Sequence, residues 1–195
     1  MKDVLILYYS CHGATQAMAN KIALGVEQAG LSARLRTVPE VSSNIGETQA
    51  SVPQQGDPYV CIQDLHECCA LALGSPTRFG NMAAPLKYFL DQTSREWLSG
   101  TLEGKPACVF TSTASMHGGQ ESTLLSMMLP LLHHGMLICG LPYSLPQLHT
   151  TMTGGSPYGV SHLAQKNSPN MLSQDEISLC IAQGKRLAIF AKQLG

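Results

Sequence analysis

The sequence predicts an α/β fold in which helices cover both faces of a doubly wound, five-stranded parallel sheet. Apolar runs of strand length recur along the chain, and three of them lead through a polar loop into a segment with helical spacing. Alternating strands and helices imply right-handed crossovers, which place helices on both faces of a parallel sheet. With 195 residues and 44% apolar content, the chain is expected to form one domain over residues 1–195.

The individual elements follow from local patterns. The sequence predicts strands at 4–9, 31–38, 68–74, 105–113 and 136–141, and helices at 15–30, 82–93 and 122–134. A last helix is predicted after the capping-box pattern of Ser173 to Glu176, with an apolar face formed by Ile177, Ile181, Leu187 and Ala188. Segments 39–60 and 142–172 are rich in Pro, Gly, Ser or Gln, which predicts long surface loops.

Five such strands suggest the flavodoxin-like strand order. In that order ligands bind beyond the carboxyl ends of the strands, at the point where the order reverses. Three loops are expected there, at 10–15, 75–82 and 112–119. The residues of these loops are therefore the candidates for a ligand site.

The first loop has the composition of a phosphate site. Ser10, Gly13 and Thr15 offer hydroxyl and backbone N–H groups at a predicted helix N-terminus, with Thr15 at or near the N-cap. Plain helix capping is the alternative explanation. The loop lacks the Gly-Lys-Ser/Thr of a nucleoside triphosphate loop and the repeated glycines of a dinucleotide fingerprint. Cys11 could be a nucleophile, but no Arg accompanies it in the loop, so it is interpreted as a passive small residue.

The other two loops are suited to a flat ligand. Arg78, Phe79 and Asn81 lie in the second loop, and the third, "STASMHGGQE", is small and Gly-rich, so that its backbone could approach a ring system closely. Together they could hold an aromatic ring whose phosphate tail lies in the first loop. A solvated charge at Arg78 and a core position for Phe79 remain the alternatives.

Charge and hydropathy exclude several classes of function. The formal net charge of −1 comes without a block of Lys or Arg, so neither nucleic acid nor an anionic membrane surface is an expected partner. No apolar run reaches membrane-spanning length, and the first residues resemble a strand more than a signal peptide. Seven cysteines without a CxxC pair indicate a cytoplasmic location. No metal is expected, because adjacent His133 and His134 would point about 100° apart on a helix.

Several motifs together resemble one family. The stretches "SCHGAT", "GSPTRFGNMAAPLKYFLDQT", "STASMHGGQE", "LLHHGM" and "GGSPYG" occur in the order and spacing of the WrbA-type NAD(P)H:quinone oxidoreductases, which are flavodoxin-like FMN enzymes. The resemblance extends from about Val4 to Leu194. Its most specific part runs from "PTRFGNM" to "LDQT".

The resemblance implies a set of site residues. Those expected to bind FMN are Ser10, Cys11, His12, Gly13, Ala14, Thr15, Pro76, Thr77, Arg78, Phe79, Gly80, Asn81, Ser112, Thr113, Ala114, Ser115, Met116, His117, Gly118 and His133. His133 is also the catalytic candidate. Trp97 would come from a neighbouring subunit to wall the substrate site, within a homotetramer built as a dimer of dimers. His12 stands where some family members have Tyr near the nicotinamide, and Met116-His117 is bulkier than an all-Gly loop.

The resemblance also implies the chemistry. NADH or NADPH would donate a hydride to FMN, and a quinone would then accept two electrons in a ping-pong cycle. Two alternatives stay open: a flavodoxin-like electron carrier, against which the near-neutral charge argues, and a non-catalytic FMN-binding regulatory protein. The sequence leaves open the choice between NADH and NADPH, with Arg34 and Arg36 only as guesses for contacts at the ribose 2′ position.

Overall fold

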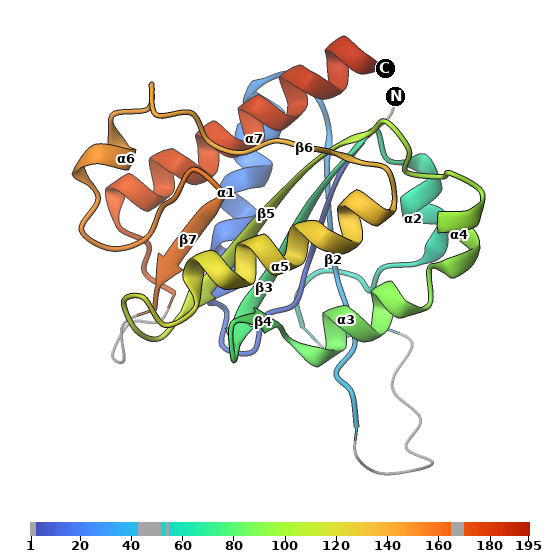
Figure 1. Ribbon diagram of the computed structural model, residues 1–195, viewed down its shortest axis with the longest axis horizontal. Coiled ribbons are helices and arrows are strands. Elements are labelled where there is room, and N and C mark those ends of the chain that lie inside the picture. The colour runs from blue at the N-terminus through green and yellow to red at the C-terminus, as the bar shows by residue number, and fades with distance from the viewer. Residues whose placement is uncertain (1–2, 43–51, 54, 165–169) are drawn as a thin grey trace.

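The computed structural model describes residues 3–42, 52–53, 55–164 and 170–195. Its main parallel strands are β1 (Val4–Tyr8), β2 (Ala33–Thr37), β3 (Ala70–Arg78), β5 (Pro106–Thr113) and β6 (Leu137–Ile138). Their order in the sheet is β2-β1-β3-β5-β6, and the paired strands are parallel. The predicted doubly wound, flavodoxin-like sheet is therefore confirmed, and the order reverses between β1 and β3 (Figure 1).

Two short strands were not predicted. β4 (Asn81–Met82) pairs antiparallel with the end of β3, and β7 (Val160–Leu163) pairs parallel with the second half of β5. β6 pairs only with the first two residues of β5. β6 and β7 therefore lie along the same edge of β5, β6 beside its first half and β7 beside its second half. The short helix α6 (Gln147–Thr150) lies in the segment that joins them.

This division corrects two predictions. The strand predicted at 136–141 is only two residues long, and the long loop predicted at 142–172 contains α6 and β7. The reason is tertiary: β7 is stabilised by hydrogen bonding to β5, fifty residues away, whereas its own four residues lie among Gly and Pro and carry a weak local pattern. Residues 165–169 of the predicted loop lie outside the described part of the chain.

Alternate residues of the sheet point into two cores. Val4, Ile6 and Tyr8 of β1 pack with α1 (Ala14–Gln28) and α7 (Gln174–Leu194) on one face. Leu5 and Leu7 pack on the other face with α2 (Ile62–Glu67), α3 (Ala84–Asp91) and α5 (Gln120–His133). Figure 1 shows α1 and α5 on opposite sides of the sheet. Burial on both faces explains the nearly continuous apolar strands.

Helix α7 packs closely against α1. A Cβ atom at Gly184 would lie 2.1 Å from the carbonyl oxygen of Ile22 on α1, so only glycine permits this approach. The predicted capping box is present: the Ser173 hydroxyl accepts from the Glu176 N–H, and the Glu176 carboxylate accepts from the Ser173 N–H.

The buried face of α7 differs from the prediction. Leu187 and Ala188 are buried as expected, but Ile177 and Ile181 are only partly buried, and Leu179 and Cys180 fill the core instead. The buried face also includes the polar side chain of Gln183, whose Nε2 donates to Val109 O and whose Oε1 accepts from Val160 N, both at 2.8 Å. A hydropathy pattern assigns such a polar residue to the surface. The buried face of α7 is therefore rotated about the helix axis relative to the predicted face.

Helix boundaries were predicted to within a few residues, and two short helices were missed in addition to α6. α2 and α4 (Ser94–Leu98) are short, at six and five residues, and carry too few periods to be recognised. The loop predicted at 39–60 includes residues 43–51 and 54, which are outside the described part. Within the described part of that segment, Tyr59 forms a parallel bridge with Thr37.

An ion-pair network joins edge strand β2 to α2. Arg34 pairs with Asp3 at 2.7 Å, Asp64 at 3.0 Å and Glu67 at 2.6 Å, and Arg36 pairs with Asp64 at 3.0 Å. In the register Arg34 lies opposite Leu5, near the amino end of β1. Arg36 lies opposite Leu7, nearer the carboxyl end of β1, and the guanidinium groups of both Arg residues are paired with Asp64 of α2.

None of the helices in the described residues is both long enough and apolar enough to cross a membrane. All seven cysteines are free thiols.

Candidate functional site

The three predicted loops meet around one cavity at the carboxyl ends of β1, β3 and β5. The cavity has a volume of ≈ 160 Å³. Its lining residues come from all three loops and one further segment: Ser10, Cys11, His12, Ala14, Thr15, Pro76, Thr77, Arg78, Ser112, Thr113, Ala114 and Ala164. Eleven of these twelve residues are among those that the sequence proposed for FMN binding.

The first loop turns the chain from β1 into α1. Gly13, at φ +84°, is the N-cap of α1, and Thr15 is the second residue of the helix, near the N-cap as predicted. The Ser10 hydroxyl accepts from the Gln16 N–H at 3.3 Å. A Cβ atom at position 13 would lie 2.7 Å from Asn170 Nδ2, so the absence of a side chain lets residue 170 approach this loop.

The first and third loops are joined directly. Thr15 Oγ1 and Ser112 Oγ lie 3.0 Å apart within hydrogen-bonding distance, and both residues are buried. In the third loop, the Thr113 hydroxyl donates to Ser115 O at 2.9 Å and accepts from Gln120 Nε2 at 3.2 Å. These bonds fix the hydroxyl-bearing wall of the cavity. Met116, His117 and Gly118 continue the loop beyond the cavity lining, with Met116 exposed and His117 at φ +56°.

The second loop is tied to α5 and has an exposed tip. Thr77 Oγ1 and Thr123 Oγ1 lie 2.7 Å apart, which anchors the end of β3 to the first turns of α5. Arg78 is exposed and donates from Nη1 to the carbonyl oxygen of Thr77 at 2.9 Å. Phe79 is completely exposed, at φ +53°, so its alternative assignment to the core is wrong. A bulky residue in this conformation is uncommon and marks a strained position.

Ala164 is a lining residue that the sequence did not propose. It follows β7, and its N–H donates to Thr113 O at 2.8 Å. Recognition of Val160–Leu163 as a strand would have placed residue 164 at the carboxyl edge of the sheet, but its four residues carried too little signal.

The chemistry of the cavity suits a phosphate ester. Hydroxyls of Ser10, Thr15, Ser112 and Thr113 surround it, and α1 begins at its wall, where free N–H groups and the helix dipole attract anions. The lining residues include the cation Arg78 and no carboxylate. Complete ligand pockets typically measure about 300–1,000 Å³. A cavity of ≈ 160 Å³ therefore accommodates the polar tail of a cofactor such as FMN, whose ring would extend to the rim.

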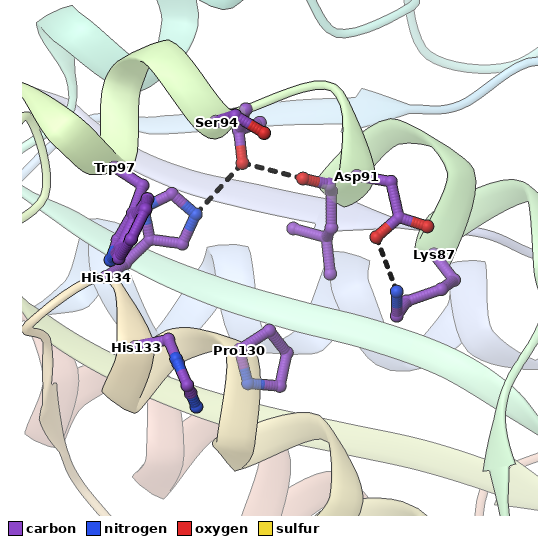
Figure 2. A pocket seen from close by; sticks show the side chains of 9 residues that line it. Lys87, Asp91, Ser94, Trp97, Pro130, His133 and His134 are labelled. Atoms are coloured by element: carbon purple, nitrogen blue, oxygen red, sulfur yellow. Dashed lines mark hydrogen bonds and ion pairs between the residues drawn. The ribbon is translucent and has the colours of Figure 1, made fainter.

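A second, larger pocket holds two further candidates, Trp97 and His133. Its volume is ≈ 370 Å³, and its lining includes Trp97, His133 and His134 between α3, α4 and the end of α5 (Figure 2). Lys87 and Asp91 form an ion pair on its wall. His134 Nε2 lies 2.9 Å from Thr93 Oγ1, and burial lowers the pKa of His134, which favours the neutral ring. No group of side chains suited to a metal ion is found among the described residues.

The two pockets are well separated in one chain. The start of α5 lies beside the second loop, whereas His133 is its last residue. With a rise of 1.5 Å per residue, the fourteen residues of α5 place His133 roughly 20 Å from the start of the helix. A single chain therefore does not bring Trp97 and His133 to the cavity of the three loops.

Comparison with known proteins agrees with this architecture. Residues 3–147 match the family described as "NADPH-dependent FMN reductase". The chain belongs to this family. Among its curated relatives are proteins named "NAD(P)H dehydrogenase (quinone)" from Solidesulfovibrio magneticus, 43% identical over 98% of both chains, and "NAD(P)H dehydrogenase (quinone) 3" from Rhizobium meliloti, 44% identical over 100% of this chain and 95% of the relative.

Two solved structures have the same fold as this member of the FMN reductase family. A flavodoxin, WrbA-like protein from Agrobacterium tumefaciens matches over 100% of both chains, with a TM-score of 0.68 and 23% identity. A flavodoxin from the domain Archaea matches over 97% of this chain and 99% of its own, with a TM-score of 0.64 and 19% identity. At these identities the likeness concerns the fold.

Proposed function

We propose that this protein is an FMN-dependent NAD(P)H:quinone oxidoreductase that reduces quinones to hydroquinones by two electrons. The observation that carries the proposal is the cavity at the switch point of the sheet, where three loops present hydroxyls, a helix N-terminus and Arg78 without a carboxylate. The relatives named as quinone dehydrogenases, at 43–44% identity over nearly the whole chain, support the choice of substrate.

Each part of the cavity has a distinct role in this proposal. Ser10 to Thr15 bind the phosphate through hydroxyls, N–H groups and the dipole of α1. Pro76 to Asn81 and Ser112 to Gly118 contact the ring and the ribityl chain, with Phe79 at the rim. FMN, when bound, supplies the hydride chemistry between NAD(P)H and the quinone. The side chains hold the planar reactants in contact and stabilise the charge that develops during reduction.

The substrate side of the site is proposed to need a second copy of the chain. One chain offers a cavity for the cofactor tail only, and Trp97 and His133 line a separate pocket. Leu125, Leu129 and Leu132 form an exposed apolar stripe on α5, at 45%, 59% and 54% exposure, which favours subunit contact. We propose a homotetramer in which Trp97 and His133 complete a neighbour's site, with His133 supplying a proton or stabilising charge and His12 contacting the nicotinamide.

The seven free thiols are typical of a reducing compartment, which supports a cytoplasmic location within this proposal.

An anaerobic experiment tests the function. The protein is saturated with FMN and mixed with NADH or NADPH while the flavin absorbance band is followed, and benzoquinone is then added. Bleaching followed by recovery of the band is the expected result, and it would also establish the ping-pong order. Tight FMN binding without bleaching would contradict the enzyme and favour a carrier or regulatory flavoprotein.

A further inference from the structure

Glu176 joins three backbone segments near the cofactor cavity. It is the third residue of α7 and is 1% exposed. Its Oε1 accepts from the N–H of Gly154 at 3.0 Å and from that of Leu163 at 3.1 Å. Its Oε2 accepts from the N–H of Ser173 at 2.7 Å and lies 2.9 Å from His162 Nδ1. One carboxylate therefore connects the segment before β7, the end of β7 and the start of α7.

These bonds require a carboxylate. Both oxygens face backbone N–H groups, which can only donate, so the amide nitrogen of a glutamine would face a donor in either orientation. Burial alone would raise the pKa of Glu176, but hydrogen bonds from His162, Ser173 and Leu163 lower it to about 2. The group is therefore ionised at neutral pH and acts only as an acceptor.

The segment that Glu176 holds forms a wall of the cavity. His162 lies opposite Ser112 in the β5–β7 register, and Leu163 lies opposite Thr113. The next residue, Ala164, lines the cavity and donates its N–H to Thr113 O. The bond from Leu163 to Glu176 is thus one residue from the wall, on the strand that pairs with Ser112 and Thr113 of the third loop.

We propose that Glu176 is a positioning residue for the cofactor, which holds the end of β7 in register so that Ala164 and the third loop present a preformed cavity to FMN. The inference rests on the proposed function, because it assumes that this cavity is the FMN site. Glu176 does not line the cavity and acts through its bonds to His162 and Leu163, the residues that precede Ala164. Its effect is therefore on cofactor affinity and not on the chemistry.

Gln183 provides a matched control on the same helix. Like Glu176 it is 1% exposed and accepts from a backbone N–H of β7, but its partner is Val160, at the opposite end of that strand. Gln183→Leu removes buried hydrogen bonds of the same kind and is expected to lower the melting temperature to a similar extent. A general loss of packing between α7 and β7 would affect both variants alike.

The experiment compares FMN affinity with stability in Glu176→Gln and Gln183→Leu. FMN is titrated into each apoprotein by calorimetry, well below its melting temperature, and turnover is measured at saturating FMN. We expect Glu176→Gln to raise the Kd for FMN at least tenfold with kcat within twofold of wild type, and Gln183→Leu to leave the Kd within twofold. Equal effects of the two variants on the Kd, or an unchanged Kd in Glu176→Gln, would overturn the proposal.

Two further variants keep the result interpretable. If Glu176→Gln does not fold, Ala164→Pro takes its place, because it removes the N–H that donates to Thr113 O at the same wall. This variant is also expected to weaken FMN binding. Unchanged FMN binding in Ala164→Pro would overturn the role of this wall. Ser112→Ala tests the cavity itself. If Ser112→Ala leaves FMN binding unchanged, the proposed cofactor site fails. If it weakens binding while Glu176→Gln does not, only the positioning role fails.

Discussion

The hydroxyls of Thr15 and Ser112 lie 3.0 Å apart, although 97 positions separate the two residues in the chain. Thr15 belongs to the first turn of α1, and Ser112 is near the carboxyl end of β5. Their contact spans the edge of the sheet across β3, which lies between β1 and β5 in the strand order. It therefore joins the first loop, for which we propose phosphate binding, to the third loop, and it connects two walls of the cavity.

Loss of the Ser112 hydroxyl should weaken FMN binding. Ser112→Ala removes a buried hydrogen bond and a possible donor to the cofactor, and with a net value of about 1 kcal/mol per bond the Kd should rise roughly five- to tenfold. Thr111→Val is the control, because Thr111 is equally buried on the same strand and bonds to Ser75 O, facing the other side of the sheet. Calorimetric titration should show normal FMN affinity in that control; a weakened control would mean a general loss of fold.

Mixing two inactive variants should restore quinone reduction if sites are shared between copies. Trp97→Ala removes the proposed substrate wall, and Ser10→Glu places a negative charge at the proposed phosphate loop. Each variant alone should have low turnover. Mixed oligomers, co-expressed with two affinity tags and purified through both, should regain activity, because one chain supplies the FMN cavity and its neighbour supplies Trp97. Mixed oligomers without recovered activity would contradict the shared site.

Asp64 should matter for stability but not for cofactor binding. Its side chain is 3% exposed and accepts from both Arg34 and Arg36, so Asp64→Ala leaves two part-buried cations without their common partner. The expected loss is about 3 kcal/mol in the free energy of unfolding. FMN affinity should be unchanged, because no residue of the network lines the cavity of the three loops. Glu67→Gln, at the exposed end of the same network, should shift the melting temperature far less.

Acid should progressively remove the stabilisation that Glu176 provides. Its pKa falls from an ordinary value of 4.5 to about 2 in the folded protein, so the folded state binds its proton less readily than the unfolded state. The contribution is complete above pH 4.5 and is lost as the pH falls through about 2. Denaturant unfolding should give a difference between wild type and Glu176→Gln on the order of 3 kcal/mol near pH 6. A difference that does not shrink between pH 4.5 and pH 2 would contradict this assignment.

The sequence by itself determined the first four parallel strands of the sheet, β1, β2, β3 and β5, and the location of the three loops. Apolar runs such as Val4–Tyr8 are continuous because the sheet is buried on both faces, and their length and spacing identify parallel strands without reference to any distant residue. The carboxyl ends of parallel strands share one edge. For that reason the loops at Ser10, Thr77 and Ser112 could be expected to meet before any contact was known.

Only the tertiary structure showed that the segment after β7 forms a further wall of the cavity. It also showed that Trp97 and His133 line a different pocket. β7 exists because β5 offers it hydrogen-bonding partners, and Glu176 holds its end through a bond from Leu163. Neither interaction leaves a periodic pattern in the sequence. Likewise, the length of α5 separates His133 from the loops, a distance that depends on how the helix lies on the sheet. Local periodicity reports which face of an element is buried, whereas the partner it is buried against is set by contacts between residues far apart in the chain.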